Sequence, residues 1–136
     1  MSPEGSLRVE YRPPSTEDFL GLRKAAGLGS RSVEAATKGL PNSLFAVTLY
    51  SGTKAIGMGR VIGDGGCNFE VVDIAVLPEY QGRGLGRLIM EEIMTFLDEN
   101  APSGSYICLI ADVPKLYEKF GFRLCAPRNE GMFIKL

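Results

Sequence analysis

Hydrophobic and polar residues alternate near the start of the chain and then change to a helical spacing. Leu7, Val9 and Tyr11 are separated by charged residues, which is typical of a half-buried strand. Ser15 is suited to cap a helix, and an apolar stripe at helical spacing begins at Phe19. The pattern therefore predicts a strand followed by a helix. A short second helix is expected over Val33–Lys38.

Three apolar, β-prone runs occupy the middle of the chain. Leu44–Tyr50 and Ala55–Ile62 are joined by a short polar turn, which predicts a hairpin. Phe69–Val76 is almost continuously apolar, and such a run is expected where a strand lies inside a sheet. The sequence therefore predicts three consecutive strands here.

The second half of the chain mixes helices and strands. Leu85–Asn100 has the spacing of an amphipathic helix, Tyr106–Ile110 predicts a buried strand, and Pro114–Phe120 predicts a short helix. Phe122–Leu124 and Met132–Leu136 are interpreted as one or two last strands. The order βααβββαβαβ(β) predicts an α/β (α+β) fold in one domain, residues 1–136. We expect a mixed central sheet of six to seven strands and about four helices.

Composition narrows the possible partners. The chain has 136 residues, 45% hydrophobic and 23% charged, which is ordinary for one globular domain. The net charge of -1 argues against nucleic-acid binding. No run approaches the roughly 20 apolar residues that span a bilayer, so no membrane partner is expected. Three widely spaced cysteines are interpreted as reduced thiols, which favours a cytoplasmic protein.

The chain contains no histidine, and this absence restricts the chemistry. Catalytic triads that depend on histidine are excluded, as are the usual zinc sites, and no metal is expected. A general base must then be a carboxylate, a tyrosine, a lysine, a bound water or the substrate itself.

The most informative segment runs from the strand Phe69–Val76 through a glycine-rich turn into the helix at Leu85. Gly82, Gly84 and Gly86 allow a ligand to approach the backbone closely. Amides at a helix start are unpaired and attract anions, so the turn is suited to a pyrophosphate. It lacks the Gly-Lys-Ser/Thr of a Walker loop and the GxGxxG of a Rossmann fingerprint.

The stretch Gln81-Gly82-Arg83-Gly84-Leu85-Gly86 closely resembles the acetyl-CoA-binding signature of the GNAT N-acetyltransferase superfamily. The downstream Leu116–Phe122, LYEKFGF, is similar to a second segment of that family. This resemblance implies that pantetheine pairs with the backbone of Ile74, Ala75 and Val76, and that Tyr117 is the general acid for the leaving thiolate. The residues implied in pyrophosphate binding are Gln81, Gly82, Arg83, Gly84, Leu85, Gly86 and Arg87.

Two carboxylates on the strand Phe69–Val76 are candidates for the general base. Glu70 matches the position of the catalytic glutamate in histone-acetylating relatives, and Asp73 an acidic position in relatives that act on sugar phosphates. Their odd separation directs them to opposite faces of a regular strand, unless a bulge intervenes. Asp73 is placed slightly ahead, since it lies closer to the predicted thioester, and a water relay remains an alternative.

The resemblance implies transfer of an acetyl group from acetyl-CoA directly to a primary amine. The favoured acceptor is a small molecule: an arylalkylamine, an amino sugar or an amino-acid derivative. The alternatives are a noncatalytic acyl-CoA-binding sensor module and a protein or peptide N-acetyltransferase. A homodimer is a further expectation from the family.

Overall fold

The computed structural model describes residues 6–136 and contains one sheet in the order β1-β2-β3-β4-β5. Neighbouring strands from β1 to β4 are antiparallel, whereas β5 is parallel to β4. The strands are β1 Leu7–Glu10, β2 Phe45–Ser51, β3 Lys54–Gly63, β4 Asn68–Val76 and β5 Tyr106–Leu109. The helical segments are α1 Thr16–Ala25, α2 Val33–Gly39, η2 Leu40–Asn42, η3 Pro78–Tyr80, α3 Leu85–Asn100 and α4 Pro114–Glu118.

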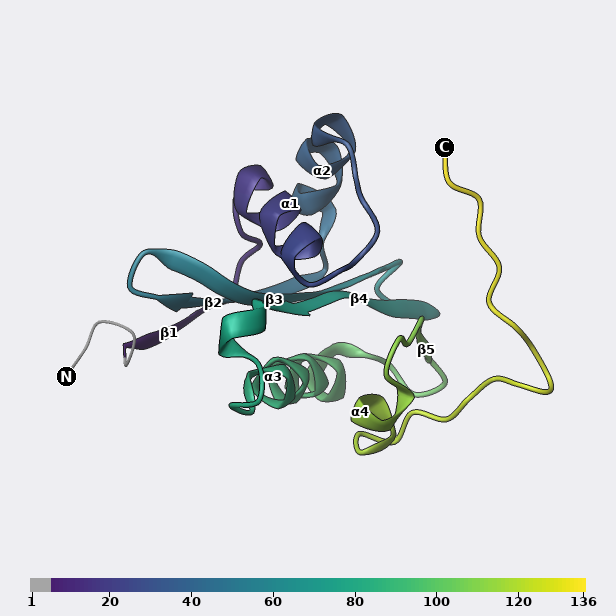
Figure 1. Ribbon diagram of the computed structural model, residues 1–136. Helices are drawn as coiled ribbons and strands as arrows, with labels where there is room; N and C mark the ends of the chain where they lie inside the picture. The colour runs from purple at the N-terminus through teal and green to yellow at the C-terminus, as the bar shows by residue number, and fades with distance from the viewer. Residues whose placement is uncertain (1–5) are drawn as a thin grey trace.

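The sheet separates two helical layers (Figure 1). Helices α1 and α2 cover one face, and α3 and α4 lie on the other. Phe19 and Leu22 of α1 are almost completely buried, and so are Ile89, Ile93 and Leu97 of α3. The apolar stripes predicted for both helices therefore form the core. Within residues 6–136, no helix combines the length and the apolar character needed to cross a membrane.

The β4 strand carries a bulge in its second half. The ladder between β3 and β4 shifts register between Met58 and Arg60, so that Asp73 and Ile74 together lie opposite Gly59. Asp73 has φ of 61°, in the left-handed region. A Cβ atom on Gly59 would lie 2.7 Å from Ile74 Cδ1 and 2.6 Å from Ile89 Cγ2, so glycine at this position leaves room for both side chains.

The prediction of six to seven strands is wrong, because residues 110–136 contain no strand. The two expected last strands, Phe122–Leu124 and Met132–Leu136, are irregular. A strand is stable only when a neighbour accepts its backbone hydrogen bonds, and this segment leaves the sheet instead of pairing with it (Figure 1). Apolar residues of the last segment are exposed as a result: Met132, Phe133, Ile134 and Leu136.

Candidate functional site

The short strand β5 pairs along its whole length with the N-terminal part of β4. The last pair in their ladder is Val71 with Leu109, and β4 then continues to Val76. At Ala75 and Val76, β4 is paired with β3 on one side, while β5 has already ended at Leu109. This opening leaves a strand edge against which an extended ligand can pair as an added strand.

The turn after β4 presents backbone rather than side chains. Gly82 and Gly84 have φ of 77° and 80°, in the left-handed region that favours glycine. A Cβ at Gly82, Gly84 or Gly86 would meet no atom within 4 Å, so the space above the turn is open. Gly84 is the N-cap of α3, and no side chain caps this helix start. The first-turn amides are therefore available to an anion.

Side chains around the turn have different contacts. Gln81 donates from Nε2 to the carbonyl oxygen of Val76 at 2.9 Å, which fastens the turn to the end of β4. The guanidinium of Arg83 lies 5.1 Å from the centre of the Tyr80 ring. Arg87 pairs with Glu91 at 3.4 Å, with both side chains well exposed. Such exposed pairs contribute little to stability, so Arg87 can turn toward a phosphate at low cost.

Leu85 has a different position from the other residues of the turn. Its side chain is partly buried and packs against the hydrophobic core. It thus anchors the first turn of α3, and its contribution to a ligand site comes from its backbone amide.

Tyr117 lies on α4, on the same side of the sheet as α3 (Figure 1). Its side chain is partly buried against the core and meets the Phe122 ring edge-on, with ring centres 6.4 Å apart. Burial raises the pKa of the Tyr117 phenol above its usual value, and the charge of Asp112 acts in the same direction. The phenol therefore keeps its proton at neutral pH and is able to donate it.

A cavity of about 330 Å³ lies on the opposite face of the sheet, below α1 and α2. Its floor is formed by β3 and β4, and it brings Glu70 and Asp73 together. The expectation of opposite faces applied to a regular strand and excepted a bulge. The structure has that bulge at Asp73, which reverses the alternation of side chains and places both carboxylates on one face. The other lining residues are Phe19, Arg31, Ala35, Ala36, Gly39, Leu40, Arg60, Ile62 and Val72.

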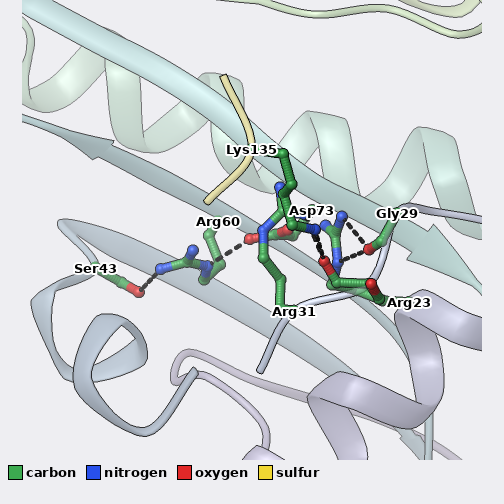
Figure 2. A network of polar contacts seen from close by, with 8 residues as sticks. Arg23, Gly29, Arg31, Ser43, Arg60, Asp73 and Lys135 are labelled. Carbon is green, nitrogen blue, oxygen red and sulfur yellow. Dashed lines mark hydrogen bonds and ion pairs between the residues drawn. The ribbon is translucent and has the colours of Figure 1, made fainter. Parts of the chain in front are cut away.

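The carboxylate of Asp73 is held by two arginines (Figure 2). Arg23 donates to Oδ1, and Arg60 Nε donates to Oδ2 at 2.8 Å. Arg60 also reaches Ser43 Oγ at 2.9 Å, and Arg23 donates twice to the carbonyl oxygen of Gly29. Only 6% of the Asp73 side chain is exposed. Both oxygens of this carboxylate are therefore engaged in a buried network that joins α1, β3 and β4.

Glu70 differs from Asp73 in its contacts. It lines the cavity and is partly exposed, and no ion pair involves it within residues 6–136. It lies opposite Cys108 of β5, in the paired part of the β4–β5 ladder. Its negative charge contributes, after burial, to raising the pKa of the Cys108 thiol. Glu70 is thus the carboxylate of this cavity that can exchange a proton without breaking an ion pair.

The arginines at this site, Arg23, Arg31 and Arg60, were not predicted from the sequence. Arg23 is buried beside Leu22 in the apolar stripe of α1, and Arg60 interrupts the apolar residues of β3. A charge at a position that the pattern marks as buried indicates a paired or functional group. That signal was present in the sequence for both residues. The cavity residue Arg31 lies just before α2, and nothing in the pattern distinguishes it.

Residues 41–124 match the family model of the acetyltransferase (GNAT) domain. The chain belongs to the GNAT acetyltransferase family. The matched region contains β2 to α4, and with them the glycine turn and Tyr117. The predicted family and the mixed α+β fold of this GNAT chain are thus confirmed.

Solved structures of GNAT relatives agree with this assignment. A probable acetyltransferase of unknown function from meticillin-resistant Staphylococcus aureus is 52% identical, with a TM-score of 0.93. The alignment covers 96% of this chain and 100% of that one. A GNAT-family acetyltransferase from Streptococcus pneumoniae is 23% identical, with a TM-score of 0.75 and coverage of 96% and 98%. The second likeness concerns the fold alone.

Curated relatives are longer than this GNAT chain. The uncharacterized N-acetyltransferase ycf52 of Porphyra purpurea is 31% identical over 83 residues, or 61% of this chain and 48% of the relative. The chloroplastic GCN5-related N-acetyltransferase 2 of Arabidopsis thaliana is 27% identical over 136 aligned positions, or 85% and 53%. The chain spans about half the length of these two relatives.

Proposed function

We propose that this protein transfers the acetyl group of acetyl-CoA to the primary amine of a small molecule. The observation that carries the proposal is the open, uncapped start of α3 directly after the free edge of β4. The turn from Gln81 to Arg87 would receive the pyrophosphate on its amides, with Arg83 and Arg87 adding charge. The backbone of Ile74–Val76 would pair with the pantetheine arm.

The acceptor amine would bind in the cavity below α1 and α2. In the reaction, the neutral amine nitrogen attacks the acetyl carbonyl carbon, and the bond between this carbon and sulfur breaks. The nitrogen loses a proton to the base, and the sulfur leaves as a thiolate or is protonated as it leaves. Direct attack needs no acyl-enzyme, so no reactive cysteine is required.

We assign the acid to Tyr117 and the base to Glu70, acting directly or through a water. The raised pKa of the partly buried Tyr117 phenol supports a role as proton donor. The sequence placed Asp73 slightly ahead as the base. Its two ion pairs shift our choice to Glu70, because Asp73 would have to leave two guanidiniums before it accepted a proton.

A second candidate is acetylation of a protein side chain or N-terminus. One relative, 27% identical over 127 aligned positions, is the histone acetyltransferase TAP1 of Glycine max. The noncatalytic acyl-CoA sensor is the remaining alternative.

A thiol-release assay with small amines and peptides distinguishes the small-molecule acetyltransferase, the protein acetyltransferase and the sensor. A control without acetyl-CoA accounts for the exposed thiols of Cys67 and Cys125. Binding of CoA without turnover of any acceptor would favour the sensor.

The cofactor site is tested by Gly84→Asp. A carboxylate at the helix start would repel the pyrophosphate, and we expect CoA affinity to fall more than about 100-fold, since repulsion between like charges costs several kcal/mol. Gly65→Asp is a matched control, because Gly65 has the same φ of 80° and equally open surroundings in the β3–β4 loop. Calorimetric titration with CoA measures both. Equal affinity of the two variants would refute the assignment of the turn.

We also propose a homodimer in the cytoplasm. The apolar side chains of Met132, Phe133 and Ile134 are 94%, 91% and 88% exposed, and β5 is at the edge of the sheet. The last segment of one copy would pair with the β5 edge of the other, which covers both surfaces. Three free cysteines support a reducing compartment. Sedimentation should show a dimer for the whole chain and a monomer after removal of residues 131–136; a monomeric whole chain would contradict the dimer.

A further inference from the structure

The cavity below α1 and α2 is lined by two arginines, Arg31 and Arg60, and by two carboxylates, Glu70 and Asp73. Arg23 does not line the cavity but binds Asp73 from α1 (Figure 2). When Arg23 is counted with the lining groups, three guanidiniums against two carboxylates leave one net positive charge. An amine that is otherwise uncharged would bring its ammonium into a site of the same sign, which is unfavourable in a partly desolvated cavity.

Arg31 differs from Arg23 and Arg60 in its contacts. Arg23 and Arg60 are engaged by Asp73 and by the oxygens of Gly29 and Ser43. Arg31 donates to the carbonyl oxygen of the adjacent Ser30 at 2.9 Å, and Nζ of Lys135 donates to the same oxygen (Figure 2). No carboxylate pairs with Arg31 in the described part of the chain.

The charge of Arg31 is close enough to affect the buried network. Burial is the main cause that lowers the pKa of Arg23, and the positive charge of Arg31 adds to this effect, whereas Asp73 opposes it. Like charges held together in this way raise the free energy of the empty site, and an anion beside Arg31 would relieve part of that cost. Arg31 is exposed to solvent, and it also forms part of the wall of the cavity, where a ligand can reach its guanidinium.

We propose, building on the acetyl transfer proposed above, that the acceptor is a small amine that also carries an anionic group, which binds Arg31. The ammonium of the same molecule then faces Glu70, the carboxylate without an ion pair. The volume of about 330 Å³ is at the lower end for a ligand pocket and suits a molecule of amino-acid size. The proposed contact with Arg31 favours a zwitterionic acceptor over an arylalkylamine, because an arylalkylamine has no anionic group to bind Arg31.

A carboxylate and a phosphate share the chemistry that a guanidinium recognises. Two pairs of acceptors distinguish them. The first pair is an α-amino acid and its primary amide, and the second is 2-aminoethyl phosphate and 2-aminoethanol. Within each pair, the comparison of wild type with variant removes differences in the basicity of the amine.

The test compares Arg31→Ala with wild type in kcat/KM for all four acceptors. One charge-assisted hydrogen bond corresponds to about a 10- to 100-fold effect. We expect this loss for the anionic member of at least one pair and a change within about twofold for its neutral partner. Arg31→Lys should recover more of the rate with phosphate, which accepts a point charge, than with carboxylate. Lys38→Ala removes an exposed cation of α2 outside the cavity. This control should change kcat/KM neither for the anionic acceptors nor for their neutral partners.

Equal losses for anionic and neutral acceptors, or a wild-type preference for the neutral partners, would overturn the proposal while leaving acetyl transfer intact. Equilibrium binding of the same four molecules to the CoA-loaded protein provides a readout that does not require turnover. If no amine releases thiol but the anionic molecules bind through Arg31, then the transfer proposal fails and the site proposal stands. If none binds, the site proposal fails.

Discussion

Replacement of Asp73 by Asn separates a structural carboxylate from a catalytic one. Asn has the same shape as Asp and also tolerates the left-handed conformation observed at this position, with φ of 61°. The change therefore removes one negative charge with little effect on the backbone. It leaves Arg23 and Arg60 without a carboxylate partner, in side chains that are only 8% and 12% exposed.

Loss of one partner from a buried ion pair costs about 3–5 kcal/mol, because the remaining charge stays desolvated. Here Asn retains one oxygen that can accept a hydrogen bond from an arginine, so we expect about 3 kcal/mol. For a domain of this size, each kcal/mol lowers the midpoint of thermal unfolding by about 3 °C. The expected decrease is therefore about 10 °C.

Thermal unfolding and the pH–rate profile are measured on the same samples. Asp98→Asn, at an exposed position of α3, is the control and should change the midpoint by about 1 °C or less. If Asp73 is structural, the acidic limb of the profile keeps its position at temperatures where the variant is folded. Adding Arg60→Met to Asp73→Asn should cost less than the sum of the single changes, since the two residues interact.

A structural role for Asp73 is refuted if Asp73→Asn unfolds within about 1 °C of wild type and the acidic limb of its pH–rate profile is displaced or lost. That result would identify Asp73 as the general base, and Glu70 would then have no role in proton transfer. Displacement of the same limb in Glu70→Gln, with an unchanged unfolding midpoint, is the pattern expected for the assignment made here.

Two further perturbations test the acid and the bulge. Tyr117→Phe should lower kcat about 100-fold and leave the KM for acetyl-CoA within about twofold. In the wild-type protein, the loss of rate at alkaline pH should lie above about pH 10, because the pKa of the Tyr117 phenol is raised. Tyr106→Phe, at an exposed tyrosine of β5, is its control, and an equal loss there would remove the acid role. Gly59→Ala should destabilise the fold by about 1–3 kcal/mol in urea unfolding, because its Cβ would lie 2.6 Å from Ile89 Cγ2. Gly57→Ala is the control and should lower the free energy of unfolding by less, because the nearest contact of its Cβ would be 3.3 Å. A larger loss of stability for Gly57→Ala than for Gly59→Ala would contradict the packing described.

The sequence pattern predicted much of the fold because most elements depend on local periodicity. The helix Leu85–Asn100 was predicted with the bounds that the structure shows. The hairpin and the strand before the glycine turn were also predicted within one or two residues. These segments have an apolar face that matches one period, and their neighbours in the chain are also their neighbours in space.

The parts that could not be predicted depend on contacts between distant residues. The bulge at Asp73 arises where Ile74 packs over Gly59, and no glycine or proline marks it in β4. Residues Met132–Leu136 have the composition of a strand, but composition does not supply the neighbouring strand that such a segment needs. The cavity was missed for the same reason, since it unites α1, α2, β3 and β4.

The glycine turn offers main-chain amides, whereas the side chains nearby are tied to the protein or exposed. A randomised library of residues 81–87, selected for retention on immobilised CoA, should therefore tolerate most replacements of Arg83 and Arg87. It should return glycine almost without exception at positions 82 and 84, where φ is positive. The glycines of the family signature are thus needed for the backbone torsion angles of the turn. Recognition of CoA here depends on main-chain amides more than on side chains.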